Sequence, residues 1–346
     1  MQKKFRIGNI TIGHNEPPVV IAEIGINHNG SLDQAINIAD KAINSGAEII
    51  KHQTHIVDDE MSEEAKKITP GNSNKSIYEI IKKCALSEKN EKKLMNYIKQ
   101  RKKIFISTPF SRAAVDRLVK FNVPAFKIGS GECNNYHLVK YISKFKKPII
   151  LSTGMNSIKT IKPSVQILKK AKLPFAILHC TNIYPTPPDL VRLNCLNELK
   201  KSFPGVILGI SDHTESNYTS IASVSLGARI IEKHFVDKKT KKGPDISCSM
   251  DPKDLKDIIN GSQIVFKSLK GEKKPLLEEK KTIAFAFASV VSIKEINQGE
   301  KLSNKNIFVR RPGNGEFKVK DLEKLYGKIA KVKIKKNIQI KKSYIL

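Results

Sequence analysis

Two histidines in this sequence stand where neighbouring parallel strands would present metal ligands. His213 follows an apolar run at 206–211, and His234 ends the next apolar run, at 228–234. Adjacent strands lie about 4.8 Å apart, so the two imidazoles can share one divalent ion and leave positions for water and substrate. Taken singly, each histidine could instead be a hydrogen-bonded core residue. Their place at the ends of adjacent predicted strands, beside acidic residues, favours the metal site.

Two lysines interrupt runs that are otherwise apolar. Lys51 lies in the run 48–53, and Lys127 lies in the run 125–128. A buried ammonium is costly unless it meets a negative group, which can be an internal carboxylate or a bound anion. Hydroxyl side chains at the ends of neighbouring runs favour a substrate with phosphate or carboxylate groups. An internal ion pair with a strand-end glutamate is the alternative.

These residues need elements that bring them together, and the sequence contains eight short apolar runs separated by longer segments of helical periodicity. The runs are 19–23, 48–53, 104–107, 125–128, 148–152, 175–179, 206–211 and 228–234. Strands that alternate with helices form parallel β-α-β units, and eight such units predict an α/β fold, the (β/α)8 TIM barrel. A doubly wound open sheet is the alternative, but the segment 25–30 lacks the G-x-G-x-x-G pattern typical of that fold.

In a barrel, the polar residues that end the strands converge on one mouth. They are Glu23, Lys51, Gln53, Thr108, Lys127, Ser130, Glu132, Ser152, His179, Asn182, Tyr184, Ser211, Asp212, His213, Glu232 and His234. The connection 55–102 is long, and we expect an extended loop on the same rim ahead of a helix at 77–84. His28 and His52 are expected to have structural roles.

The composition changes near residue 270. We assign residues 1–269 to the barrel, 270–282 to a linker, and 283–346 to a small β-rich domain. The predicted strands of that domain are 286–293, 307–309, 330–334 and 338–340. A domain of about 60 residues buries little surface alone, so we expect it to pack against a partner surface.

The overall composition is that of a globular protein with a sizeable core. The chain has 346 residues, 40% hydrophobic and 27% charged, and a formal net charge of +29. Its lysines are scattered without a dense basic tail, which argues against nucleic-acid binding, although the positive field would attract small anions. Five cysteines without a C-x-x-C pair favour a reducing cytoplasm. No apolar run approaches the ~20 residues that span a bilayer, so we expect a cytoplasmic protein without a membrane segment.

An ordered series of segments carries a family resemblance. They are IAEIGINHNG (21–30), KHQTH (51–55), STPFSR (107–112), KIGSGE (127–132), LSTGM (151–155), YPTP (184–187), SDH (211–213) and EKHF (232–235). Together they resemble the bacterial sialic acid synthases (N-acetylneuraminate synthases). The segment RPGNG (311–315) is similar to the antifreeze-like, or SAF, domain that follows the barrel in that family.

The resemblance implies an enzyme that condenses phosphoenolpyruvate with N-acetylmannosamine and releases phosphate by C–O cleavage. It implies a divalent cofactor on His213 and His234, foremost Mn2+, with Mg2+ or Co2+ as alternatives. It also implies that Glu23 stabilises the positive charge that develops during the reaction and positions the attacking water. The implied assembly is a domain-swapped homodimer.

The resemblance further assigns substrate contacts. For the phosphate and carboxylate they are Lys51, Asn72, Thr108, Lys127, Ser130, Ser152 and Ser211, and for the sugar they are Gln53, Glu132, Asn182, Tyr184 and Asp245. Phe285 and Arg311 are expected to complete the partner subunit's site. Two alternatives stay open: a legionaminic or pseudaminic acid synthase that uses a modified 6-deoxy hexose, and a non-catalytic sugar-binding protein.

Overall fold

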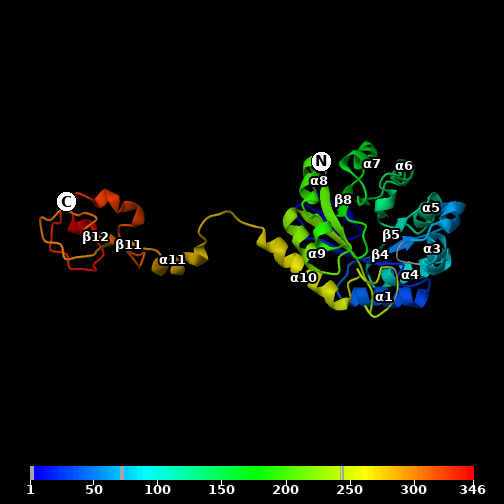
Figure 1. The fold of residues 1–346 in the computed structure, drawn as a ribbon, viewed down its shortest axis with the longest axis horizontal. Helices are drawn as coiled ribbons and strands as arrows, with labels where there is room; N and C mark the ends of the chain where they lie inside the picture. The colour runs from blue at the N-terminus through cyan, green and yellow to red at the C-terminus, as the bar shows by residue number, and fades with distance from the viewer. Residues whose placement is uncertain (1–3, 71–73, 242, 244) are drawn as a thin grey trace. The chain divides into compact units, whose positions relative to one another are not determined.

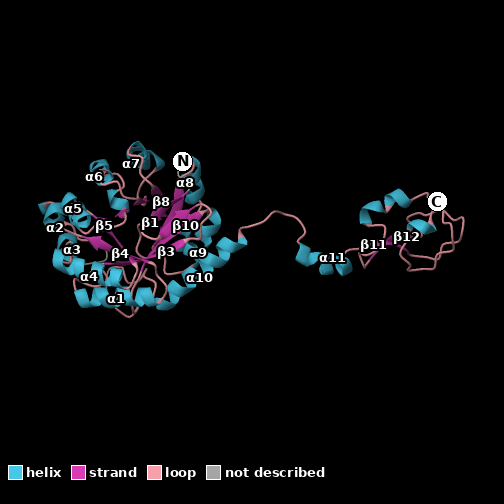
Figure 2. Ribbon diagram, turned by 180° about the vertical axis from the view of Figure 1, so that it is seen from behind, coloured by secondary structure: helices cyan, strands magenta, loops and turns pink. Residues whose placement is uncertain are grey.

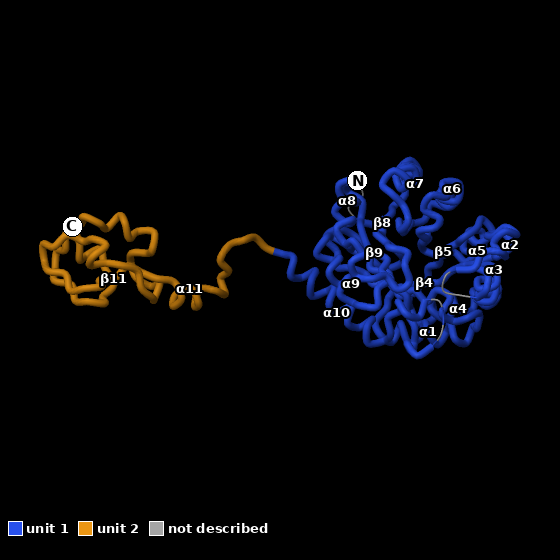
Figure 3. Tube along the Cα trace, viewed as in Figure 1, with its two compact units in different colours: residues 1–270 blue, residues 271–346 orange. Residues whose placement is uncertain are grey.

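The computed structural model describes residues 4–70, 74–241, 243 and 245–346. The chain divides into two compact units, Met1–Lys270 and Gly271–Leu346 (Figure 3). Each unit is described by itself. Within the described ranges, none of the helices has the length and apolar character needed to cross a membrane.

The first unit is built around a closed barrel of eight parallel strands, which confirms the predicted fold (Figure 1). Successive strands are neighbours, and β10 pairs with β3 to close the ring. The strands are β3 (Val19–Gly25), β4 (Ile49–Thr54), β5 (Ile104–Pro109), β6 (Phe126–Ile128), β7 (Ile149–Ser152), β8 (Phe175–Cys180), β9 (Ile207–Asp212) and β10 (Ala228–His234). Each lies within two residues of its predicted bounds at either end.

Branched apolar side chains fill the barrel at the starts of its strands. Inward residues such as Ile21 and Ile49 form one buried cluster, as expected for stacked layers inside a TIM barrel. An antiparallel hairpin of β1 (Lys4–Ile7) and β2 (Ile10–Gly13) adds Phe5 and further side chains to this cluster. The sequence prediction missed this hairpin. With that end of the barrel filled, the polar mouth lies at the carboxyl ends of the strands.

The helices form a layer outside the barrel (Figure 2). They are α1 (Leu32–Asn44), α2 (Val57–Glu60), α3 (Ile77–Cys84), α4 (Glu88–Gln100), α5 (Arg112–Lys120), α6 (Tyr136–Ser143), α7 (Ile158–Lys170), α8 (Cys195–Ser202), α9 (Tyr218–Ser223) and α10 (Pro252–Ser268). At the start of α1 the Ser31 hydroxyl accepts a hydrogen bond from the Gln34 amide (3.3 Å), the expected N-cap. Gly46 and Gly227 have φ of +103° and +101°, the left-handed conformation that turns each helix into the next strand.

The connection 55–102 differs from the prediction of an extended loop. In its described part it holds α2, a 3-10 helix at Glu63–Lys67, α3 and α4. Helix α3 has its predicted bounds and begins at a capping box formed by Ser76 and Glu79. The segment is helical because its apolar residues, Ile81 among them, bury a small cluster together with Ile26.

The second unit contains α11 (Lys280–Ala286), which begins inside the predicted linker, and an antiparallel pair, β11 (Ser289–Ser292) and β12 (Ile307–Arg310). Eight buried apolar residues form its core. The predicted strands at 330–334 and 338–340 contribute only isolated bridges, Ile296 with Ile334, Ala330 with Ile345 and Val291 with Gln339. These segments are too irregular in their pairing to form ladders.

Candidate active site

A cavity of about 130 Å³ lies at the mouth of the barrel. Most of the strand-end residues predicted to converge do so, because parallel strands in a closed barrel end at one rim. The lining residues are Glu23, Lys51, Gln53, Thr108, Phe110, Lys127, Gly129, Ser130, Gly131, Ser152, Cys180, Asn182, Tyr184, Ser211, His213, Glu232 and His234.

A buried network of two ammonium groups and two carboxylates forms one wall of this cavity. The Lys51 ammonium contacts Glu23 directly and lies 3.8 Å from Glu232 Oε1, and the Lys127 ammonium lies 3.5 Å from the same oxygen. Each of the four residues is at most 4% exposed. The internal ion pairs considered as an alternative therefore exist, and they balance the charges of both lysines.

Hydroxyl groups complete the hydrogen bonds of the two lysines. Lys127 Nζ donates to Ser152 Oγ (2.7 Å), and Lys51 Nζ donates to Thr108 Oγ1 (3.1 Å). The two ammonium groups are thereby oriented toward the cavity along with hydroxyls that can donate to an anion. Such an arrangement suits a ligand that carries more than one acidic group.

Burial shifts the pKa values in this network in opposite directions. It raises the pKa of Glu23 to about 7, against the opposing effect of Lys51. Burial also lowers the pKa of Lys127. For Lys51, burial acts to lower the pKa, but the carboxylates of Glu23 and Glu232 outweigh it and the pKa is raised. A carboxyl that titrates near neutrality can exchange a proton during turnover.

The two histidines lie side by side in the lining of the same cavity. Their ring centroids are 5.5 Å apart. His213 Nδ1 lies 2.8 Å from the Thr181 carbonyl oxygen, which can only accept, so Nδ1 carries a proton. Burial, followed by the charge of Lys51, lowers the pKa of His234 to about 3, so this ring is neutral. The buried His234 Nδ1 has no hydrogen-bond partner.

These features fit a pair of metal ligands, since the ring nitrogen that His213 leaves out of its hydrogen bond and the unpartnered His234 Nδ1 are donor atoms that a divalent ion can take. Asp245 Oδ2 lies 3.7 Å from His234 Nδ1. Over the described ranges, His, Cys, Asp and Glu side chains nowhere form a group of three suited to hold an ion. Water and substrate would therefore have to supply the remaining ligand atoms, as in open catalytic sites.

Polar and aromatic residues surround the histidine pair. The Tyr184 ring is 4.1 Å from the ring of His213, and Asn182 Nδ2 donates to the Tyr184 hydroxyl (3.5 Å). In the same lining, Gln53 Nε2 donates to Glu23 Oε1 (3.3 Å). Burial raises the pKa of Asp245 to about 6. Amide, phenol and carboxyl groups of this kind can hydrogen-bond sugar hydroxyls.

Some predicted substrate contacts lie elsewhere. Glu132 does not line the cavity, and it accepts a hydrogen bond from Asn135 Nδ2 (2.6 Å). Asn72 lies outside the described residues. Phe285 and Arg311 belong to the second unit, where both are exposed, so their roles stay predictions.

Two strand-end residues were assigned to the mouth wrongly. His179 and Asp212 point outward, because side chains alternate along a strand and their neighbours Cys180 and Ser211 point inward. The same alternation would have identified Cys180, which the sequence prediction missed. Its Sγ lies 3.8 Å from His213 Nδ1.

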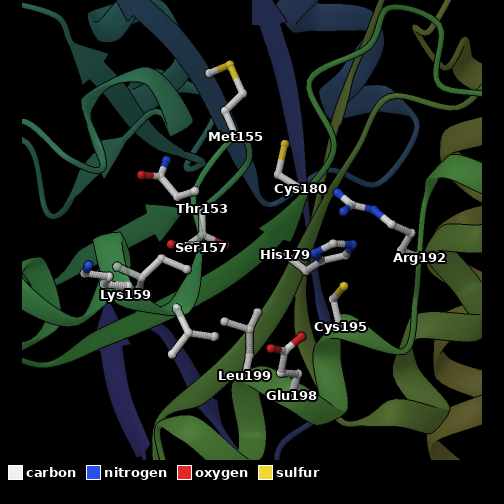
Figure 4. A pocket seen from close by; sticks show the side chains of 13 residues that line it. Thr153, Met155, Ser157, Lys159, His179, Cys180, Arg192, Cys195, Glu198 and Leu199 are labelled. Carbon is white, nitrogen blue, oxygen red and sulfur yellow. The ribbon is translucent and has the colours of Figure 1, made fainter.

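His179 projects into a second cavity of about 600 Å³, between the segments that follow β7 and β8 (Figure 4). His179 Nε2 lies 2.6 Å from the Val191 carbonyl oxygen. This cavity is larger than the one at the mouth, but the ion network and the histidine pair are not part of its lining. We therefore place the active site at the mouth.

Comparisons with known proteins show which family this chain resembles along most of its length. The sequence model of the NeuB family matches residues 38–274, and that of the SAF domain matches residues 287–345. The chain is 36% identical over 320 residues to N,N'-diacetyllegionaminic acid synthase of Campylobacter jejuni, covering 90% of this chain and 95% of that protein. It is 33% identical over 269 residues to human N-acetylneuraminate-9-phosphate synthase, covering 77% and 75%.

A solved structure shares the fold. The N-acetylneuraminic acid synthetase of Leptospira borgpetersenii, crystallised with citrate, superimposes with a TM-score of 0.74 and 30% identity. The match covers 82% of this chain and 96% of that one.

Proposed function

We propose that this chain, which belongs to the NeuB family, condenses phosphoenolpyruvate with N-acetylmannosamine to give N-acetylneuraminate and phosphate. The observation that carries the proposal is the mouth of the barrel. There, two buried lysines, a carboxyl with a pKa of about 7 and the two histidines line one cavity. Relatives that cover most of the chain are named as synthases of sialic acid type.

Lys51 and Lys127 would bind the phosphate and carboxylate of phosphoenolpyruvate. Ser152 and Thr108 already accept hydrogen bonds from these ammonium groups. Ser130 and Ser211 also line the cavity and would donate to the same anion. Because the lysines are buried, their attraction for an anion is only weakly screened by water.

His213 and His234 would hold a divalent cation, for which we propose Mn2+, with Mg2+ or Co2+ as alternatives. When bound, the cation would act as a Lewis acid on the aldehyde of the open-chain sugar. The side chains of Gln53, Asn182, Tyr184 and Asp245 would orient that sugar.

Glu23 would act at the carbon of phosphoenolpyruvate to which water adds. The vinyl carbon of phosphoenolpyruvate bonds to the sugar aldehyde, and positive charge develops on the adjacent carbon. The ionised Glu23 carboxylate stabilises that charge and takes a proton from the water that adds there. Loss of phosphate by C–O cleavage then leaves the keto acid.

One comparison favours a different sugar as the substrate. The Campylobacter jejuni relative that covers 90% of this chain is named for N,N'-diacetyllegionaminic acid. The test is to incubate the purified chain and Mn2+ with phosphoenolpyruvate and either N-acetylmannosamine or the 2,4-diacetamido-6-deoxy sugar. Phosphate is measured, and the keto acid is identified by mass spectrometry. Sugar-dependent phosphate release supports the synthase, and no release with any sugar supports a non-catalytic sugar-binding protein.

We also propose a domain-swapped homodimer in which Arg311 and Phe285 of each chain serve the partner's site. Phe285 is 63% exposed, although it is a large apolar side chain. Light scattering would give the oligomeric state. Arg311→Ala should weaken use of the sugar while leaving the affinity for phosphoenolpyruvate unchanged.

A further inference from the structure

A buried ion pair lies directly behind the two histidines. Asp212 in β9 and Lys233 in β10 are register partners, and Lys233 Nζ lies 3.2 Å from Asp212 Oδ2, with both side chains 1% exposed. They precede His213 and His234 in the sequence. Alternation along the strands turns them away from the cavity, so they take no direct part in the proposed reaction.

Lys233 binds both residues that flank His213. Besides the bond to Asp212, its ammonium donates to the Thr214 carbonyl oxygen (2.5 Å) and to Thr214 Oγ1 (3.3 Å). An ammonium has three N–H donors, so all of them are used on the two neighbours of His213. Since Lys233 immediately precedes His234, a single side chain connects the backbone around one histidine to the backbone of the other.

Asp212 is itself held in place by the helix behind it. Its Oδ2 accepts from Ser220 Oγ (2.6 Å) and Thr219 Oγ1 (2.8 Å), and its Oδ1 accepts from the Thr214 amide (3.0 Å). Ser220 and Thr219 belong to α9. The ion pair therefore has a fixed position relative to the barrel as well as to the histidines.

A charged pair is unexpected at this point of the core. Ile210 and Ile231 lie two residues earlier on the same outward faces of β9 and β10, and both pack in the main apolar core. Replacing a buried ion pair by apolar residues often leaves a protein equally stable, so stability alone does not account for the charges. Buried polar groups can instead specify register, and a slip of one residue would turn His234 out of the barrel.

We propose that Lys233, through Asp212 and Thr214, is a positioning residue that sets the spacing of His213 and His234 and thereby the affinity of the site for a divalent cation. This inference rests on the proposed function, because it assumes that the two histidines bind the cation.

The test compares Mn2+ binding in metal-stripped, full-length proteins by titration calorimetry, with electron paramagnetic resonance as a second measure. Lys233→Met should weaken Mn2+ binding by about 10- to 100-fold, the usual effect of losing a group that orients a metal ligand. The affinity for phosphoenolpyruvate, measured without metal, should stay within about threefold of wild type. Circular dichroism and thermal melting report the fold of each variant.

Arg117→Met is the matched control. Arg117 is another largely buried cation of the first unit, paired with Glu91 Oε2 at 3.1 Å. Its loss leaves a buried carboxylate without that partner, as Lys233→Met does, but neither Arg117 nor Glu91 lines the cavity that contains the histidine pair. Arg117→Met should lower the melting temperature and leave Mn2+ affinity unchanged.

Lys233→Met leaves the Asp212 carboxylate buried without its ion-pair partner, which can by itself prevent folding. The double variant Asp212→Asn/Lys233→Met leaves no unpaired buried charge, so Mn2+ affinity is measured in it as well. Mn2+ affinity within threefold of wild type in either folded variant overturns the positioning role and leaves the proposed function intact. Two results would overturn the metal part of the proposed function, and the inference with it. One is that the wild-type chain binds no Mn2+, and the other is that the His213→Ala variant binds Mn2+ with the same affinity as the wild type. Weakened binding in the Lys233 variants but not in Arg117→Met supports the inference.

Discussion

Glu23 and His234 are register partners across the seam where β10 pairs with β3. The Phe235 amide donates to the Glu23 carbonyl oxygen (2.7 Å), which fixes the two strand ends against each other. The acid of the first strand and the imidazole of the last are thus neighbours only because the barrel closes. In the proposed reaction, this pairing places Glu23, which takes a proton from water, next to His234, which would hold the cation that binds the sugar aldehyde.

Glu23→Gln should separate catalysis from binding. The amide cannot take a proton from water, so we expect kcat to fall by about 10²- to 10⁴-fold. Loss of the charge that pairs with Lys51 should leave phosphoenolpyruvate binding unchanged or tighter. Phosphate release and calorimetry measure the two effects. Glu48→Gln, a surface change, is the control, and wild-type turnover in Glu23→Gln would remove Glu23 from the mechanism.

The pH dependence of activity should show an acidic limb with an apparent pKa near 7, since burial raises the pKa of Glu23 to about 7. Activity should rise with pH through this range as the carboxylate forms. The effect on stability has the opposite sign. Between pH 4.5 and about 7, Glu23 holds a proton in the folded state but not in the unfolded chain. The contribution of Glu23 to the free energy of unfolding therefore decreases as the pH rises through this range. A flat pH profile of kcat/KM between pH 5.5 and about 8 would contradict the role of Glu23 as a base.

Lys127→Met should affect one substrate only. Its ammonium is buried beside Ser152 and Glu232, where we expect it to bind an acidic group of phosphoenolpyruvate. A lost charged hydrogen bond should raise KM for phosphoenolpyruvate by about 10- to 100-fold, with little change in KM for the sugar. Lys144→Met on the exposed surface is the matched control. An equal rise in both KM values would indicate general damage to the site instead.

Gly154→Ala should damage the sugar side of the cavity. A Cβ at this position would lie 1.8 Å from Asn182 Oδ1 and 2.9 Å from Ser130 Oγ, so Asn182 must move. We expect KM for the sugar to rise at least about 10-fold, with a larger effect on the sugar than on phosphoenolpyruvate. Gly131 lines the same cavity but has nothing within 4 Å of an added Cβ. Gly131→Ala should therefore behave as wild type, and equal kinetics for the two variants would show that Asn182 is not needed.

His213→Ala should abolish both Mn2+ binding and turnover, because one imidazole alone makes a weak site. Treatment of the wild type with a chelator should stop phosphate release, and added Mn2+ should restore it. His137→Ala, on the exposed side of α6, should change neither property. Activity that persists after complete removal of metal would exclude a catalytic role for the cation.

The sequence by itself determined the architecture and most of the residues at the mouth. Alternating apolar and helical segments specify the strands, and parallel strands end at one rim, so Lys51 and Lys127 could be placed together from their strand positions alone. The hairpin β1–β2 escaped prediction because two four-residue strands carry too little periodicity. The predicted extended loop was wrong because a small apolar cluster decides the fold of that segment. Glu132 takes part in a local hydrogen bond with Asn135 outside the lining of the cavity, and its contact with the sugar stays a prediction.

Only the tertiary structure decided which polar neighbours share a function. Asp212 and His213 are adjacent in the sequence, yet one faces α9 and the other the cavity. The pKa of Glu23 likewise depends on burial and on Lys51 and Glu232, which come from other strands. The sequence specifies the type of each side chain and, within a strand, which residues share a face. Burial and charge act through space, so their effects exist only once the barrel has closed.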